Sequence, residues 1–240
     1  MLEFQTLVVV LLIVFAAVFG QSIAGFGIAL IAMPLLVPTV GIEISRPLVA
    51  VIGGVNSILF LLNYRDSIDL KVIAPLAVTS VIATPLGEVL INVAPERAVT
   101  GALGVFIIAY SIYGLASPHI PEIRKAIWAY IAGLVSGILT GAYNTGGPPL
   151  VIYATACRWP PAEFKGNLQA IGMAKAIMVL ITHGVSGNFT APVMSTFGLA
   201  LPVLGVATLI GFYIGDRINA DVFQKIVLVL LLVLGIRLLV

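Results

Sequence analysis

Two uncharged runs of this chain are too long to cross a membrane once as straight helices. Residues 4–42 and residues 126–157 contain no Asp, Glu, Lys or Arg. As unbroken helices they would reach roughly 58 Å and roughly 48 Å, at about 1.5 Å per residue. The hydrocarbon core of a bilayer is only about 30 Å thick, which about 20 helical residues span. Each run must therefore turn back or break inside the membrane.

The composition points to one class of protein. The 240-residue chain is 60% hydrophobic and 9% charged, with a mean hydropathy of +1.17. We therefore expect an all-α polytopic membrane protein whose partner is the lipid bilayer. A net charge of +2 is too small to indicate nucleic acid as a partner. The single cysteine, Cys157, cannot form an internal disulfide or a metal cluster, and we expect no cofactor and no metal.

Helix-breaking residues stand inside both runs. Glycine accepts backbone angles that other residues avoid, and proline at the first helical position loses no hydrogen bond. A turn followed by a new helix is therefore expected near Ile28 in the first run and near Pro148 in the second. The breakers are Gly20, Gly25 and Gly27 in the first run, and Gly141, Gly146, Gly147, Pro148 and Pro149 in the second.

The two broken runs begin the two halves of a weak internal repeat. Residues 44–58 match residues 163–177 without a gap, which pairs Asn56 with Lys175. Further along, Gly87 pairs with Gly215. Such symmetry is typical of transporters, and it predicts two repeats, residues 1–120 and residues 121–240, which together form one transport domain.

The placement of Lys and Arg decides how the broken runs cross the membrane. If each run crosses once, the chain has eight spans and its basic residues divide almost evenly between the two faces. If each run is a hairpin, one face carries three basic residues and the other eight, a clear positive-inside bias. The three are Arg46, Arg97 and Arg237, and the eight are Arg65, Lys71, Arg124, Lys125, Arg158, Lys165, Arg217 and Lys225.

The hairpin arrangement gives five membrane segments in each half, one hairpin plus three transmembrane helices. Because five is odd, the second half enters from the opposite face and the repeat is inverted. Both termini are then expected on the outer face of the cell's inner membrane. Two kinked helices in an eight-span protein are the alternative.

Lys175 is the charged residue that this arrangement leaves deepest in the membrane. A lysine at the centre of a spanning helix costs about 2.5 to 3.5 kcal/mol on insertion scales. The hairpin tips would present helix N-termini at the same depth, and such ends favour anions. As an alternative, Lys175 is neutral, or it bonds Glu88, Asp216 or free carbonyls at a hairpin tip.

Two glycine-rich stretches resemble the paired motifs of the sulfite exporter TauE/SafE family, also called the 4-toluene sulfonate uptake permease family. They are GQSIAGFGIALIAMPLL, from Gly20, and GLVSGILTGAYNTGGPPLVIYA, from Gly133. The resemblance implies transport of sulfite, sulfonate or sulfoacetate across a bacterial or archaeal inner membrane. It also implies a substrate-facing tip at Asn144, Thr145, Gly146, Gly147 and Pro148. The first motif is incomplete, because Ile28 and Ala29 stand where the family often has glycines.

The combined interpretation is a secondary transporter that moves a small sulfur anion by alternating access through a site at the membrane midplane. A passive anion channel is the alternative. A coupled proton or sodium ion, a role for Glu88 or Asp216 in carrying protons, and a homo-oligomer are left open. In the expected site Lys175 supplies the positive charge. The anion's oxygens are bound by Asn144, Thr145 and the amides of Gly146 and Gly147. The site is completed from the other half of the chain by Gln21, Ser22 and Asn56.

An intramembrane protease is a remote third hypothesis. The stretch GVSG, residues 184–187, fits the short GxSG pattern of rhomboid proteases. Catalysis needs a histidine on a facing helix to activate Ser186, yet His183 lies in the same turn. We therefore expect no enzymatic activity.

Overall fold

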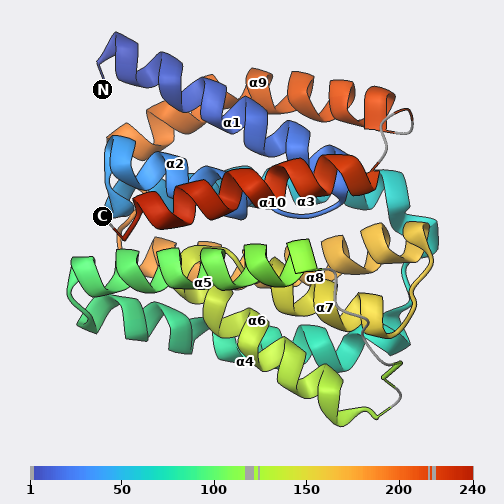
Figure 1. The fold of residues 1–240 in the computed structure, drawn as a ribbon. Helices are drawn as coiled ribbons and strands as arrows, with labels where there is room; N and C mark the ends of the chain where they lie inside the picture. The colour runs from blue at the N-terminus through green and yellow to red at the C-terminus, as the bar shows by residue number, and fades with distance from the viewer. Residues whose placement is uncertain (1–2, 117–121, 124, 216, 218–219, 240) are drawn as a thin grey trace. The chain divides into compact units, whose positions relative to one another are not determined.

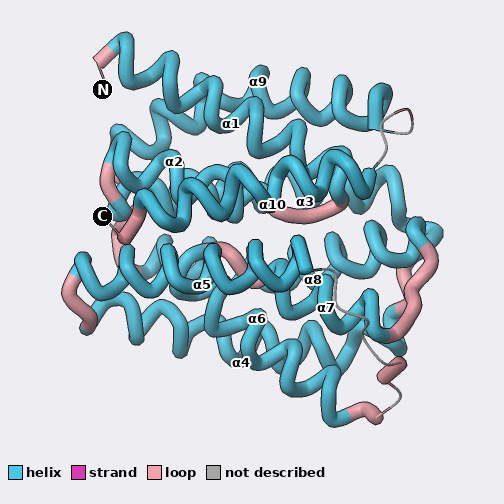
Figure 2. The backbone as a smooth tube through the Cα atoms, in the orientation of Figure 1, coloured by secondary structure: helices cyan, strands magenta, loops and turns pink. Residues whose placement is uncertain are grey.

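Every regular element that the structure describes is a helix (Figures 1 and 2). The computed structural model describes residues 3–116, 122–123, 125–215, 217 and 220–239. The predicted all-α class is confirmed. The helices are α1 (Phe4–Ala24), α2 (Ile28–Val40), α3 (Ile42–Tyr64), η1 (Arg65–Ser67), α4 (Leu70–Val93), α5 (Glu96–Ala116), α6 (Ile127–Tyr143), α7 (Gly147–Ala156), α8 (Pro161–Val185), α9 (Ala191–Gly215) and α10 (Ala220–Arg237).

Six of the described helices are long and apolar enough to cross a bilayer. Apolar side chains also cover outward faces, as on α4, where Val78, Ile82 and Leu86 are all more than half exposed. A face of this kind at helical spacing suits contact with lipid rather than water. The six segments are Phe4–Ala24, Ile42–Ser67, Leu70–Ile91, Arg97–Ala116, Pro161–Val185 and Ala191–Gly215.

Both long runs break where glycine or asparagine accepts a left-handed backbone. Between α1 and α2, Gly25 and Gly27 have φ of 82° and 108°. Between α6 and α7, Asn144 has φ of 57°. Asparagine is one of the few non-glycine residues that tolerates this conformation, and it commonly ends helices. The second helices begin at Ile28, as predicted, and at Gly147, one residue before the predicted Pro148.

The chain folds into two compact units, and each draws on both halves of the sequence. Unit 1 comprises residues 1–52, 94–118 and 187–240, and unit 2 comprises residues 53–93 and 119–186, as far as these are described. Helix α3 passes from unit 1 to unit 2 at Gly53.

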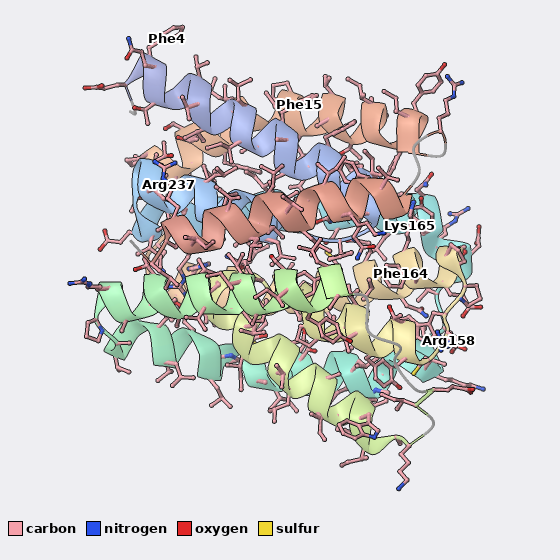
Figure 3. The ribbon with its side chains drawn as sticks, viewed as in Figure 1. Phe4, Phe15, Arg158, Phe164, Lys165 and Arg237 are labelled. Carbon is pink, nitrogen blue, oxygen red and sulfur yellow. The ribbon has the colours of Figure 1, made fainter. Side chains whose placement is uncertain are left out.

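In unit 1, α1 packs against α2 and α9, and α5 packs against α10. Helices α5 and α10 are antiparallel, because Gly104 faces the carbonyl of Gly235 while Gly114 faces Leu228. The N-terminal end of α1 and the C-terminal end of α10 lie at the same end of this unit (Figures 1 and 3).

In unit 2, α4 and α6 run parallel in close backbone contact. Glycines of α6 allow this approach at each turn: Gly133 lies against Leu76, Gly137 against Ser80 and Gly141 against Thr84. Helix α8 packs against α4, α6, α7 and η1. The close contact between the glycines of α6 and the backbone of α4 fixes α6 in place, and it thereby positions the segment that follows α6.

The chain reverses between α6 and α7. The Ile123 N–H, which precedes α6, donates to the carbonyl of Ala156 at the end of α7 over 3.1 Å. Asp69 directly precedes α4, which runs parallel to α6, and its N–H donates to Asn167 Oδ1 near the start of α8 over 2.9 Å. The start of α8 therefore lies at the same end of unit 2 as the starts of α4 and α6. Basic residues gather at this end, where Figure 3 shows Arg158 and Lys165. They are Arg65, Lys71, Lys125, Arg158 and Lys165.

Candidate functional site

Lys175 is a buried cation well inside α8. Its position is about 21 Å along the helix axis from Pro161, at 1.5 Å per residue. Only 5% of the residue is exposed. The side chain cannot reach either end of its helix, so its ammonium group must be solvated by the protein or by a ligand.

The ammonium group of Lys175 bonds two neutral oxygens of the second hairpin. Its Nζ donates to Ser136 Oγ on α6 over 2.8 Å and to the carbonyl oxygen of Gly146 over 3.5 Å. Ser136 Oγ in turn donates to the same Gly146 carbonyl over 2.6 Å. The three groups tie α8 to α6 and to the start of α7. They hydrogen-bond the ammonium group without neutralising its charge.

No carboxylate pairs with Lys175 in the part of the chain that the structure describes. Glu88 is buried on α4 in the same unit and has contacts of its own. Asp216, the other carboxylate considered from the sequence, lies outside the described residues. Of the alternative partners for Lys175, a carbonyl at the hairpin tip is the one observed.

Three successive residues at this tip carry hydrogen-bond donors with no partner among the described residues. Thr145 Oγ1 is buried without a hydrogen bond, and the residue is only 1% exposed. The N–H groups of Gly146 and Gly147 at the start of α7 also make no described hydrogen bond. Pro148 and Pro149 follow and have no N–H group. Consecutive donors of this kind at a helix N-terminus favour an anion.

Gly146 fits this place because it has no side chain. A methyl group there would lie 2.8 Å from Lys175 Nζ and would overlap Thr140 Oγ1 and the Ser136 carbonyl oxygen. The tip is therefore held tightly between α6 and the ammonium group. Asn144 shapes the turn, because its N–H donates to the Thr140 carbonyl over 2.8 Å and closes α6.

The tip between α1 and α2, in unit 1, differs because its polar side chains hydrogen-bond to backbone groups of the same two helices. Gln21 Oε1 accepts the N–H of Ile28, the first residue of α2, over 2.9 Å. Ser22 Oγ donates to the Val18 carbonyl over 2.9 Å, and Ser22 packs against Gly211 of α9. A small cavity of about 20 Å³ beside this tip is lined mainly by apolar side chains such as Phe223.

The structure brings together only part of the predicted site. Lys175 contacts Gly146, with Thr145 and Gly147 on either side of that glycine. Asn56 is fully buried on α3 in the same unit. Gln21 and Ser22 belong to unit 1. For these three residues a role at the site stays a prediction.

Ser136 and Thr140 were not predicted from the sequence, although a signal was present. Both lie on α6 one turn apart, and so they share a face with each other. The Thr140 hydroxyl donates to the Ser136 carbonyl over 2.7 Å. Hydroxyl groups at this spacing just before a helix break would have indicated side chains directed at the tip.

Comparison with known proteins gives two consistent matches. A family model described as "Sulfite exporter TauE/SafE" matches residues 10–238. A protein of Cupriavidus necator, described as "Probable sulfite/organosulfonate exporter TauE", is 24% identical over 208 residues. That match covers 82% of this chain and 79% of the relative. No solved structure matches.

Proposed function

The chain belongs to the sulfite exporter TauE/SafE family, and from this premise we propose that Lys175 and the α6–α7 tip bind the anion that it carries. Members of the family are membrane transporters and not enzymes. The chain is accordingly a multi-pass membrane protein that transports a small sulfur-containing anion. Sulfite and organosulfonates are the substrates that we propose, because the Cupriavidus relative is named for them.

One observation carries the location of the site. A buried ammonium group without a described carboxylate partner lies beside three donors at a helix N-terminus that have no partner among the described residues. Burying an uncompensated charge is costly, and an anion at this point would offset that cost. The same anion would accept the hydrogen bonds that Thr145, Gly146 and Gly147 lack.

Each residue has a distinct role in the proposed site. Lys175 supplies the charge, while the Thr145 hydroxyl and the N–H groups of Gly146 and Gly147 bind oxygens. Asn144 holds the turn in its left-handed conformation. The side chain of Asn56, buried on α3 in the same unit, is proposed to complete the site.

We further propose that residues 1–120 and 121–240 are inverted repeats. The support is that equivalent helices pack in equivalent ways. Gly87 of α4 lies against Ile138 of α6, while Gly215, its counterpart on α9, lies against Ile23 of α1. The basic end of unit 2 is then cytoplasmic, and both termini are on the outer face of the inner membrane.

Counterflow in proteoliposomes tests the proposed function. Vesicles loaded with unlabelled sulfite under anaerobic conditions should accumulate radiolabelled sulfite transiently, because a carrier exchanges one bound anion for another. Empty vesicles with the same protein content are the control. Equal uptake in loaded and empty vesicles would contradict a carrier, and large anion currents would favour the channel. Repeating the assay with imposed proton or sodium gradients identifies any coupled ion.

A further inference from the structure

We infer that the Lys175 site selects singly charged anions with an SO₃ head group, namely organosulfonates and hydrogensulfite, over the dianions sulfite and sulfate. The inference rests on the proposed function and specifies its substrate. It follows from the charges and donors around the α6–α7 tip.

The described residues of unit 2 that pack around Lys175 include no second cation to balance a dianion. Within this unit α8 packs against α4, α6, α7 and η1, and also against residues 53–64 of α3, where Ser57 bonds Gln169 and Tyr64 is the titratable side chain. On η1, Arg65 and Asp66 are exposed. On α4, Lys71 is exposed at the basic end, and the buried Glu88 can only add negative charge.

The remaining titratable side chains of these helices add no second cation close to Lys175. Helices α6 and α7 carry no Asp, Glu, Lys, Arg or His. Their tyrosines, Tyr130, Tyr143 and Tyr153, carry no cationic group. On α8 itself, Glu163 and Lys165 lie about 18 Å and about 15 Å from Lys175 toward the basic end, and His183 lies about 12 Å away in the other direction. All three are too far along the axis to share one small anion with Lys175.

One ammonium group therefore balances one negative charge. A singly charged anion beside Lys175 forms a neutral pair, whereas a dianion leaves one uncompensated charge inside the protein. The other donors, the Thr145 hydroxyl and the N–H groups of Gly146 and Gly147, are neutral and cannot remove it. Leaving a buried charge unpaired is strongly unfavourable.

The donors also match the shape of the head group. Three neutral donors lie on successive residues, and they suit three oxygens attached to one sulfur atom. Sulfate carries two charges and has a fourth oxygen that these three neutral donors do not match.

Ligand-dependent thermal stabilisation of the purified full-length protein tests this selectivity. The three probes are methanesulfonate, which carries one charge at all working pH values, sulfate, which carries two, and sulfite, which gains its proton near neutrality. We expect methanesulfonate to bind and sulfate to bind about a hundredfold more weakly or not at all. The ratio of sulfite affinity to methanesulfonate affinity should rise as the pH falls through neutrality.

The ratio is the informative quantity, because titration of the protein affects both ligands alike and cancels. Sulfate binding as tightly as methanesulfonate would overturn the inference, and so would a ratio that stays constant or rises with pH. Either result would leave the proposed transport function standing. If neither sulfite nor methanesulfonate binds at any pH, the proposed function fails together with its specificity. Lys175→Met is the control that should abolish methanesulfonate binding.

Discussion

Replacing Lys175 with methionine is expected to abolish sulfite counterflow while the protein remains folded. Methionine is similar in length to lysine and carries no charge, so it removes the proposed anion partner without leaving a large void. The Ser136 hydroxyl keeps its bond to the Gly146 carbonyl, which at 2.6 Å is shorter than the 2.8 Å bond from Lys175. We expect transport to fall by at least about a hundredfold, as when one partner of a buried charge pair is lost.

The stability of this variant distinguishes a binding role from a structural one. A buried lysine costs about 2.5 to 3.5 kcal/mol at the centre of a membrane helix, and no described carboxylate offsets that cost. The methionine variant should therefore unfold at the wild-type temperature or above it. Lys165→Met is the matched control, because Lys165 lies at the basic end of α8 with its Nζ 5.6 Å from the Tyr64 ring centroid. Wild-type counterflow in Lys175→Met would contradict the proposed site.

Gly137→Val is expected to destabilise unit 2 severely. A Cβ atom at this position would lie 2.7 Å from Ala83 Cβ and would overlap the Ser80 carbonyl oxygen. Because both neighbours belong to the packed face of α4, α6 would have to move away along much of its length. Overpacking of this kind typically costs about 1 to 3 kcal/mol, and two branched methyl groups place the change at the upper end of that range.

Gly205→Val on α9 is the matched control for this prediction. A Cβ atom at Gly205 meets nothing within 4 Å, so the same substitution should leave packing intact. Thermal unfolding in detergent and the yield of monodisperse protein measure both variants. Equal unfolding temperatures for the two would show that the close contact between α4 and α6 does not hold unit 2 together.

The breaks in the helices were predictable from the sequence because local chemistry determines them. Gly25 and Gly27 adopt positive φ, and α2 begins at Ile28 as predicted. Lys175 was also predictable as a buried cation, because its distance from both ends of an apolar segment depends only on helix geometry. These features need no knowledge of which helices become neighbours.

Features that depend on packing between distant segments were not predictable. The bond from Lys175 to Ser136 joins α8 to α6, and no sequence spacing encodes that contact. The two units combine helices from both halves of the chain, and a repeat in the sequence does not specify which helices pack together. Gln21, expected to contact substrate, has its side-chain oxygen engaged by the Ile28 N–H, a bond that forms only after the chain turns at Gly25.

Cysteine labelling on either side of the α6–α7 tip tests most directly the claim that this segment is a hairpin with its tip inside the membrane. In a Cys157→Ser background, single cysteines at Lys125 and Arg158 would report the two ends of the hairpin, and one at Glu43, before Arg46, would report the other face. A membrane-impermeant maleimide should label positions 125 and 158 only from the cytoplasmic side and position 43 only from outside. Labelling of positions 125 and 158 from opposite sides would contradict the account, because the segment would then cross the membrane once and present no hairpin tip to Lys175.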